Sequence, residues 1–395
     1  MATGGEVSRA HNRARVLRLL FERGPQPRQL LARQLGLTPA SVSRIVAECL
    51  AAGLVEEGAP GVASERGGPR PIPVSLTPNR YGVGAIHLGW FWVDVAVLNL
   101  QGTVLHHRRE ARVAGPPEAV WQQAVALFQA LGETAGRQIL AIGVTLNGEV
   151  DPTTGAVVGY NALGWPTVPL RAWGEAAFAV PVVVDTNVYA MALAASLKDP
   201  PPTGRPLLLL NVGSTIGLAV VVDRQVLRGA HHRSGFLELL PWPDAHGGWQ
   251  RLADLLSDRA LLAQAQTLGV PSADRIETLR FIARTDERIR KLLRQRAEHA
   301  GTFLAVAAVM HDPARLWVTG SITAEDLPYL QAAYRAALPT DYPWAEPALV
   351  PDTRAPFPVE AAGYLALERV LSPALQLEPA SPSSALTWMP RVVPS

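Results

Sequence analysis

The sequence predicts an α/β protein in which a small N-terminal unit of three helices and a β-hairpin precedes a larger domain built from two similar lobes. Three observations support this fold class. Apolar residues recur at helical spacing in three short segments of the first 54 positions, and two short extended segments follow. From residue 82 three strands and a helix succeed one another, and a similar three-stranded opening begins at residue 207. A hydrophobic content of 48% over 395 residues is ample for sizeable cores.

The first helix is expected at residues 10–22, with Val16, Leu17, Leu20 and Phe21 facing inward. A Gly-Pro-Gln-Pro stretch then separates it from residues 28–54, which read as two short helices joined by a tight turn. Gly36 allows the turn, Thr38 can cap the second helix, and Pro39 suits its first position. This order is typical of a helix-turn-helix.

The second helix of this pair has an apolar side and an outward side. Its inward residues are Val42, Ile45, Val46, Cys49 and Leu50, and its outward residues are Ser41, Ser43, Arg44, Ala47 and Glu48. Small and hydroxylated residues with one arginine suit a helix that enters the major groove of DNA, and Gly53 ends the helix in a left-handed cap position. An ordinary helical hairpin with solvated Ser and Arg is the alternative interpretation.

The segment that follows favours DNA binding. Residues 54–57 and 72–76 read as two strands with a long loop between them, which together make a wing. The loop carries Arg66 and Arg70 beside two glycines, a composition that fits a loop lying along the DNA backbone or in a minor groove.

The charge of the chain is unevenly distributed. Residues 1–80 carry a formal charge of +5, and the remainder carries −3, so the attraction for polyanions lies at the N-terminus. Cys49 is the single cysteine, which excludes a disulfide framework and a multi-cysteine zinc site, and its position predicts a small core residue. No apolar run approaches the length of a membrane span, and we expect a cytoplasmic protein.

The two lobes are predicted element by element. In the first, strands are expected at 82–88, 92–100, 102–108, 139–145 and 180–184, with helices at 117–131 and 187–197 and a turn at 151–155. In the second, strands are expected at 207–212, 217–222, 225–227 and 316–318, with helices at 252–268, 272–283, 287–310, 324–337 and 359–371. The resulting domains are residues 1–78, 79–200 and 201–371, and the Pro/Ser-rich tail 372–395 is expected to be disordered.

The chain resembles the ROK family, which groups bacterial repressors of sugar genes with sugar kinases. The resemblance extends to residue 371, and each motif is short, but their order and spacing are specific. They are the runs Ala14-Arg15-Val16 to Val46, Arg66 to Pro71, Val150-Asp151-Pro152-Thr153-Thr154-Gly155, Leu163-Gly164-Trp165 with Val168-Pro169-Leu170, and Leu227-Arg228-Gly229-Ala230. The resemblance implies a two-lobed actin and hexokinase-like (ribonuclease H-like) domain whose cleft binds ATP and a sugar in the kinases.

The kinase motifs of the family are degenerate in this chain. The first phosphate loop of the kinases reads Asp-x-Gly-Gly-Thr, whereas here His87 stands for the Asp and Trp90 for a glycine. The general base of the kinases is an Asp, and the matching position holds Asn187, an amide that cannot accept the proton. The second phosphate loop keeps only some glycines. Phe236 and Leu239 replace the sugar-binding Glu and the metal-ligating His, and the zinc cysteines are missing. We therefore expect no catalytic residue, no cofactor and no metal.

Polar groups still map to the cleft by resemblance. They are Asn147, Asn161, Asp185 and Asn187, which could hydrogen-bond a sugar or sugar-like effector, although helix capping explains Asp185 equally well. The adjacent pairs His106-His107 and His231-His232 are expected to be surface histidines, because no Cys or carboxylate lies at ligand spacing. For Trp165, Trp173, Trp242 and Trp249, packing in a core or at an interface is the expected role, with sugar stacking as the alternative.

These observations predict a sequence-specific DNA-binding transcription regulator, a repressor-type protein of carbohydrate-related genes, with an inactive ROK domain for oligomerisation and ligand sensing. Its partner would be double-stranded DNA, read in two half-sites by a homodimer or higher homo-oligomer. Ser41, Ser43 and Arg44 would contact the major groove, Thr38 a phosphate, and Arg66 and Arg70 the backbone or minor groove. The alternatives are a sugar kinase and a DNA-binding protein whose ROK domain is only an assembly scaffold.

Overall fold

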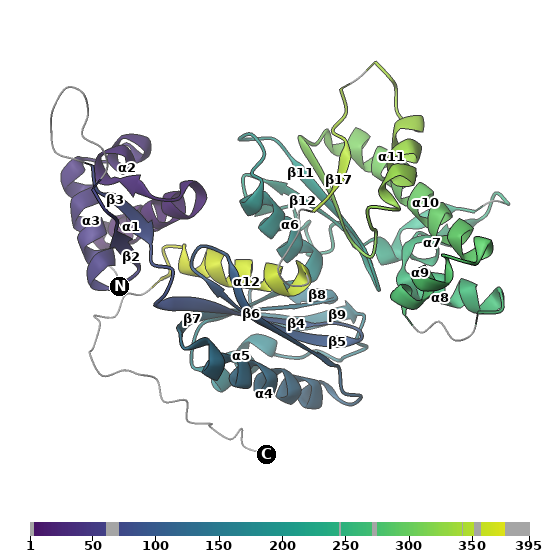
Figure 1. The fold of residues 1–395 in the computed structure, drawn as a ribbon, viewed down its shortest axis with the longest axis horizontal. Coiled ribbons are helices and arrows are strands. Elements are labelled where there is room, and N and C mark those ends of the chain that lie inside the picture. Colours follow the sequence, from purple (N-terminus) through teal and green to yellow (C-terminus); the bar gives the residue numbers. More distant parts are fainter. Residues whose placement is uncertain are drawn as a thin grey trace.

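The computed structural model describes residues 4–60, 71–244, 246–270, 275–341, 343–350 and 357–375. Its N-terminal unit contains α1 (Gly4–Arg23), α2 (Arg28–Leu35) and α3 (Pro39–Ala51), drawn in purple in Figure 1. A small sheet completes it, in which β3 (Pro73–Leu76) lies between β1 (Gln26–Pro27) and β2 (Val55–Glu57). Val55 pairs with Leu76, which confirms the strands of the predicted wing.

Local backbone chemistry sets the ends of these helices as the sequence predicts. Gly36 has a φ of 64° after α2, and Gly53 has a φ of 72° after α3, both in the left-handed region that favours glycine. The Oγ1 atom of Thr38 accepts a hydrogen bond from the Ser41 N–H at 3.2 Å, and Pro39 follows as the first residue of α3. The turn between the two helices is therefore built from short-range interactions.

The first lobe is a five-stranded sheet with the order β10-β7-β4-β5-β6. Its strands are β4 (Tyr81–Leu88), β5 (Trp92–Asn99), β6 (Val104–Ala111), β7 (Gln138–Leu146) and β10 (Val182–Thr186). Helices α4 (Pro117–Ala135) and α5 (Leu170–Phe178) cover one face, below the sheet in Figure 1. Helix α6 (Asn187–Lys198) follows β10 directly, as predicted.

The sequence analysis missed three elements of this lobe. The predicted turn at 151–155 is the tip of a hairpin formed by β8 (Gly148–Asp151) and β9 (Ala156–Asn161). Helix α5 was missed because it has nine residues and a central glycine, Gly174, which weakens the helical signal. A Cβ atom at Gly174 would lie 2.9 Å from the Val182 side chain, so the glycine lets α5 approach β10.

The second lobe is a five-stranded sheet with the order β13-β12-β11-β16-β17, and helices cover it. The strands are β11 (Leu207–Val212), β12 (Ile216–Val222), β13 (Gln225–Val226), β16 (Arg315–Gly320) and β17 (Pro347–Leu349). The helices are α7 (Ala253–Leu256), α8 (Asp258–Thr267), α9 (Ile276–Ile282), α10 (Glu287–His311) and α11 (Leu327–Ala336).

Two details of the second lobe differ from the sequence-based expectation. The single helix predicted at 252–268 is divided at Ser257, whose hydroxyl caps α8 by accepting from the Ala260 N–H at 3.2 Å. A hairpin of β14 (Pro241–Pro243) and β15 (Trp249–Arg251) was not predicted, because proline at both ends of β14 argues against a strand.

The last helix, α12 (Phe357–Val370), packs on the sheet of the first lobe and against α6. The sequence analysis assigned residues 357–370 to the second lobe, so this assignment differs from the structure. Gly143 in β7 is the reason for the close packing, since a Cβ atom there would lie 1.8 Å from the carbonyl oxygen of Ala362. Figure 1 shows α12 in yellow above β4, β6 and β7.

The N-terminal unit packs on the first lobe. Buried residues of α1 and α3 belong to the same apolar cluster as those of α6 and α12. The Tyr81 hydroxyl donates to the Ala52 carbonyl at 2.7 Å, and the ring of Phe21 meets that of Tyr364 edge-on at 6.2 Å. Within the described residues, no helix is long and apolar enough to cross a membrane.

Candidate functional site

The outward side of α3 is available on the surface of the N-terminal unit. Arg44 is exposed, Ser41 and Ser43 are half-buried, and the opposite side of the helix is buried. The hydroxyl of Thr38 donates to Ser41 Oγ at 2.9 Å, so these two predicted residues are already joined by the helix cap. Arg66 and Arg70 of the wing loop lie outside the described residues. The arrangement presents a small-residue surface with the exposed guanidinium of Arg44, which suits close approach to a groove.

The inward side of α3 contains Cys49, which is fully buried. Burial raises the pKa of its thiol to about 12, so the thiol is neutral and unreactive at physiological pH. Cys49 is thus a small core residue, as the sequence predicts.

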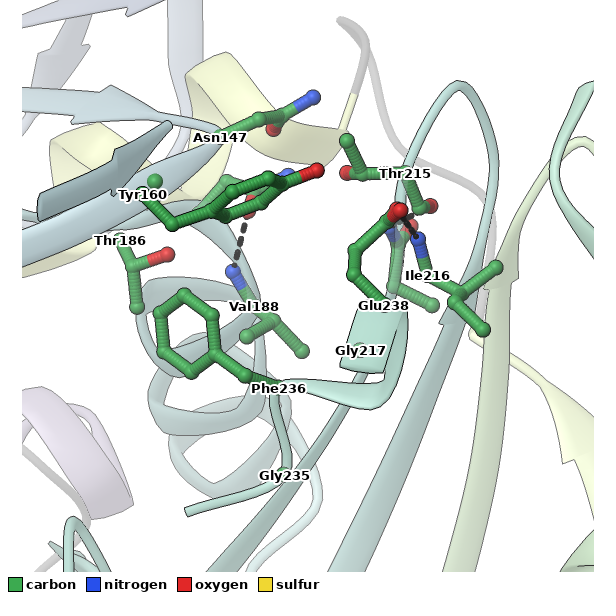
Figure 2. Close-up of a pocket in the computed structure, with 13 residues that line it drawn as sticks. Asn147, Tyr160, Thr186, Val188, Thr215, Ile216, Gly217, Gly235, Phe236 and Glu238 are labelled. Atoms are coloured by element: carbon green, nitrogen blue, oxygen red, sulfur yellow. Dashed lines mark hydrogen bonds between the residues drawn. The ribbon is translucent and has the colours of Figure 1, made fainter. Parts of the chain in front are cut away.

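A pocket lies between the two lobes, where the ends of β7 and β10 face the start of β12 (Figure 2). Its volume of about 20 Å³ accommodates roughly one water, so a hexose would require the walls to move. The first lobe contributes Asn147, Gly148, Tyr160, Thr186, Asn187 and Val188, and the second contributes Asn211, Thr215, Ile216, Gly217, Gly235, Phe236 and Glu238.

Two of the four predicted cleft residues line this pocket. Asn147 donates through Nδ2 to Ser214 Oγ of the other lobe at 3.4 Å, while its buried Oδ1 has no hydrogen-bond partner among the described residues. Asn187 stands at the start of α6, and its Oδ1 accepts from the Val188 N–H at 2.8 Å. The unpartnered oxygen of Asn147 leaves the pocket one acceptor that a ligand hydroxyl or water can satisfy.

The other two predicted residues do not line the pocket. Asn161 holds the backbone of Trp165, donating to its carbonyl at 2.8 Å and accepting from its N–H at 2.9 Å. Asp185 forms a two-pronged ion pair with Arg228 of the second lobe, at 2.9 and 2.5 Å. Asn161 is therefore a structural residue in this arrangement, and Asp185 joins the lobes.

Sequence reasoning missed Glu238 and Tyr160 as pocket residues. By the family resemblance, Phe236 stands at the position of the sugar-binding Glu, and the sequence analysis named no carboxylate of the second lobe as a cleft residue. The side chain of Glu238, two residues later, lies in the pocket. Its Oε1 accepts from the Ile216 N–H at 3.0 Å, and its Oε2 accepts from Arg259 at 3.1 Å. The signal available in the sequence was a glutamate within the otherwise apolar run 236–240.

Tyr160 crosses the pocket from the first lobe. Figure 2 shows its ring between Asn147 and Phe236, with the hydroxyl directed toward Thr215. Burial and the nearby Glu238 carboxylate raise the pKa of this hydroxyl, so it stays protonated and can donate a hydrogen bond.

Two cation–π contacts join the start of the first lobe's β-hairpin to the second lobe. The guanidinium of Arg259 lies 5.4 Å from the ring centroid of Trp90, and that of Arg275 lies 4.7 Å from Trp92. Both arginines come from the second lobe, so these contacts span the two lobes, and Arg259 also bonds Glu238 of the pocket.

His87 is buried at the end of β4, and its Nδ1 lies 3.0 Å from Thr145 Oγ1. The Thr145 hydroxyl donates to the Pro358 carbonyl at 3.2 Å, so we infer that Nδ1 carries the proton. Burial lowers the pKa of His87 to about 4, which keeps the ring neutral at pH 7.

The histidines and tryptophans that were assigned from the sequence differ in their exposure. His107 is half-buried and lies 2.8 Å from the buried carboxylate of Asp94, so it is not a simple surface histidine. Trp165 is in the core, whereas Trp249 is 74% exposed on β15, which excludes core packing for Trp249 within this chain and leaves interface packing as its expected role. Among the described residues, no group of three or more His, Cys, Asp and Glu side chains is arranged to hold a metal.

Comparison with known proteins agrees with this architecture. The ROK family profile matches residues 83–349, and a winged helix-turn-helix DNA-binding profile matches residues 9–56. A transcriptional regulator of Mycobacterium tuberculosis is 29% identical over 336 residues, covering 79% of this chain and 75% of the relative. An N-acetylglucosamine repressor of Escherichia coli O157:H7 is 26% identical over 344 residues, covering 81% and 83%.

Solved structures show the same fold. A ROK family transcriptional regulator, a homolog of the Escherichia coli MLC protein, aligns with a TM-score of 0.72 and 21% identity over 92% of this chain and 98% of its own. A ROK family glucokinase from Streptomyces griseus, in complex with glucose and AMPPNP, aligns with a TM-score of 0.62 and 20% identity over 72% and 99%. The regulator match includes the N-terminal unit, whereas the glucokinase match covers less of the chain.

Proposed function

Because this chain belongs to the ROK family and carries a winged helix-turn-helix DNA-binding domain, we propose that it is a sequence-specific transcription regulator. The observation that carries the proposal is the outward side of α3, on which Arg44 is exposed and Ser41 and Ser43 are half-buried, while the opposite side of the helix is buried. Relatives that align with this chain over 75% and 83% of their own length are named a transcriptional regulator and a repressor.

A helix of this kind reads few base pairs, so stable binding needs two copies. The proposed binding form is a homodimer or higher homo-oligomer that places two α3 helices in successive major grooves. Thr38 would lie near a phosphate, and Arg66 and Arg70 would follow the backbone or minor groove.

We also propose that the ROK domain senses a small polar molecule and does not phosphorylate it. Asn187 stands where the family's kinases have a carboxylate base, and it is already bonded to the Val188 N–H. By the same resemblance, Trp90 stands where the kinases have a glycine in the first phosphate loop, and its ring lies 5.4 Å from the guanidinium of Arg259. The unpartnered Oδ1 of Asn147 and the protonated hydroxyl of Tyr160 support a polyol or sugar-like effector.

The proposal is tested by selecting DNA from a genomic library with the purified full-length protein and sequencing what is retained. We expect enriched inverted repeats with half-sites about one helical turn apart. Random retention of sequences would contradict sequence-specific binding.

The sugar kinase alternative is tested separately. A coupled assay with ATP and a panel of common hexoses should give no turnover above a protein-free control. Turnover with any hexose would overturn the non-enzymatic assignment.

A melting-temperature screen against the same carbohydrates distinguishes a sensor from an assembly scaffold, because a molecule that binds the folded state raises the melting temperature. A panel in which none of the carbohydrates shifts the melting temperature would favour the scaffold.

A further inference from the structure

Helix α1 of the DNA-binding unit is held by both lobes of the ROK domain. Arg18 pairs with Glu368 of α12 at 2.6 Å, and Phe21 packs edge-on against Tyr364 of the same helix. One residue further along α1, Glu22 forms an ion pair with Arg224 of the second lobe. Because α12 packs on the first lobe, α1 bridges one element of each lobe.

The second-lobe contact is made by a rigid turn. Asp223 and Arg224 connect β12 and β13 as a two-residue hairpin, and both have positive φ, at 48° and 63°. Positive φ at both positions is the pattern of a type I′ turn, whose backbone twist matches that of the two strands it joins. Arg224 therefore moves with β12 and not independently of it.

Both β12 and α12 begin beside the interlobe pocket. At the start of β12, the Ile216 N–H donates to Glu238 in the pocket. At the start of α12, the Pro358 carbonyl accepts from Thr145, two residues before Asn147 in the pocket wall. The seven residues of β12 and the fourteen residues of α12 each span about 20 Å. Two rigid elements of matching length thus run from the pocket to α1, one in each lobe.

We propose that the angle between the two lobes controls the DNA-binding unit through these elements. This inference rests on the proposed function and adds its regulatory route. A ligand that changes the distance between Asn147 and Glu238 tilts β12 relative to α12. The tilt changes the relative positions of Arg224 and Glu368, which both form ion pairs with α1. Interlobe ion pairs, Asp185 with Arg228 and Glu149 with Arg233, hold the arrangement seen in this structure.

The test does not require the ligand to be known. Arg228→Ala removes the interlobe ion pair with Asp185, which immediately precedes Thr186 in the pocket wall, and Arg224→Ala removes the contact with α1. The full-length protein, both single variants and the double variant are titrated with the operator DNA recovered by the genomic selection. We expect Arg228→Ala to change the operator Kd by about fivefold or more in the presence of Arg224, and by less than about twofold in the Arg224→Ala background.

An equal change in both backgrounds, or no change with Arg224 present, would overturn the proposal. The matched control is Arg335→Ala, which breaks an exposed ion pair with Glu346 that lies wholly within the second lobe and should leave operator binding unchanged. Circular dichroism and melting temperature confirm that each variant is folded, and the swap Glu22→Arg with Arg224→Glu should restore the coupling.

Hydrogen exchange of the DNA-free protein tests the interlobe route whether or not the protein binds specific DNA. Arg228→Ala should accelerate amide exchange at the C-terminal end of α1, and in the Arg224→Ala background it should add nothing further. If the chain binds no specific DNA, this exchange experiment still decides whether lobe position reaches α1. Unchanged exchange at α1 in Arg228→Ala would refute the route even if operator binding is normal.

Discussion

The backbone N–H of Ile216 donates a hydrogen bond to Oε1 of Glu238 at 3.0 Å, at the first residue of β12. This bond joins the wall of the interlobe pocket to a strand whose other end contacts the DNA-binding unit. The same carboxylate also accepts from Arg259, which in turn covers Trp90 of the first lobe. Glu238 therefore connects the pocket, the contact between the lobes and the path to α1.

Replacement of Glu238 should show this connecting role. Glu238→Ala leaves the Ile216 N–H and Arg259 without their acceptor, and we expect a loss of about 1–3 kcal/mol in the free energy of unfolding. Glu238→Gln keeps one acceptor oxygen and should lose less. Urea denaturation of the three proteins gives the comparison. Equal stability of Glu238→Ala and the parent would show that the two donors find other acceptors.

Arg44 should carry base selectivity. We expect Arg44→Ala to weaken operator binding by about 1–3 kcal/mol at particular base positions, because the guanidinium is exposed on the outward side of α3. Arg70→Ala in the wing loop should instead weaken binding to all sequences alike. Fluorescence anisotropy with a set of single-base operator variants measures both profiles, and Arg335→Ala on α11 is an exposed control. Identical profiles for Arg44→Ala and Arg70→Ala would refute this division of roles.

The cap of α3 should contribute to local stability. Thr38→Ala removes the acceptor for the Ser41 N–H, and we expect the opening free energy of the first turn of α3 to fall by about 1 kcal/mol. Native-state hydrogen exchange measures it, and Thr38→Ser, which retains the hydroxyl, is the conservative control. The cap has no energetic role if both variants exchange like the parent.

His87 should make stability depend on pH. Its pKa is about 4 in the folded protein against 6.5 for an unperturbed histidine, so the unfolded state binds the proton more readily. The stabilising contribution of neutral His87 is complete above about pH 6.5 and is lost as the pH falls toward 4, by about 2 kcal/mol at pH 5. Urea denaturation at pH 7.5 and pH 5 should show this loss in the parent and a smaller one in His87→Gln. The same pH dependence in both proteins would assign it to other groups.

Much of the N-terminal unit was predictable because its determinants are local. The cap at Thr38, the left-handed Gly36 and Gly53, and the apolar spacing of α3 act within a few residues, so the sequence alone identified the helix-turn-helix. The order of strands and helices in both lobes was largely recognisable for the same reason, since periodicity reports which side of an element is buried.

The partners of those buried sides were decided only by the tertiary structure. Periodicity predicted the last helix but not its position on the first lobe, which depends on the space that Gly143 leaves 219 residues earlier for Ala362. Likewise Asp185 pairs with Arg228, Asn161 hydrogen-bonds the backbone of Trp165, and the side chain of Glu238 lies in the pocket. Such contacts join residues far apart in the chain, or depend on where a side chain points after the lobes meet, and spacing along the sequence carries no information about either.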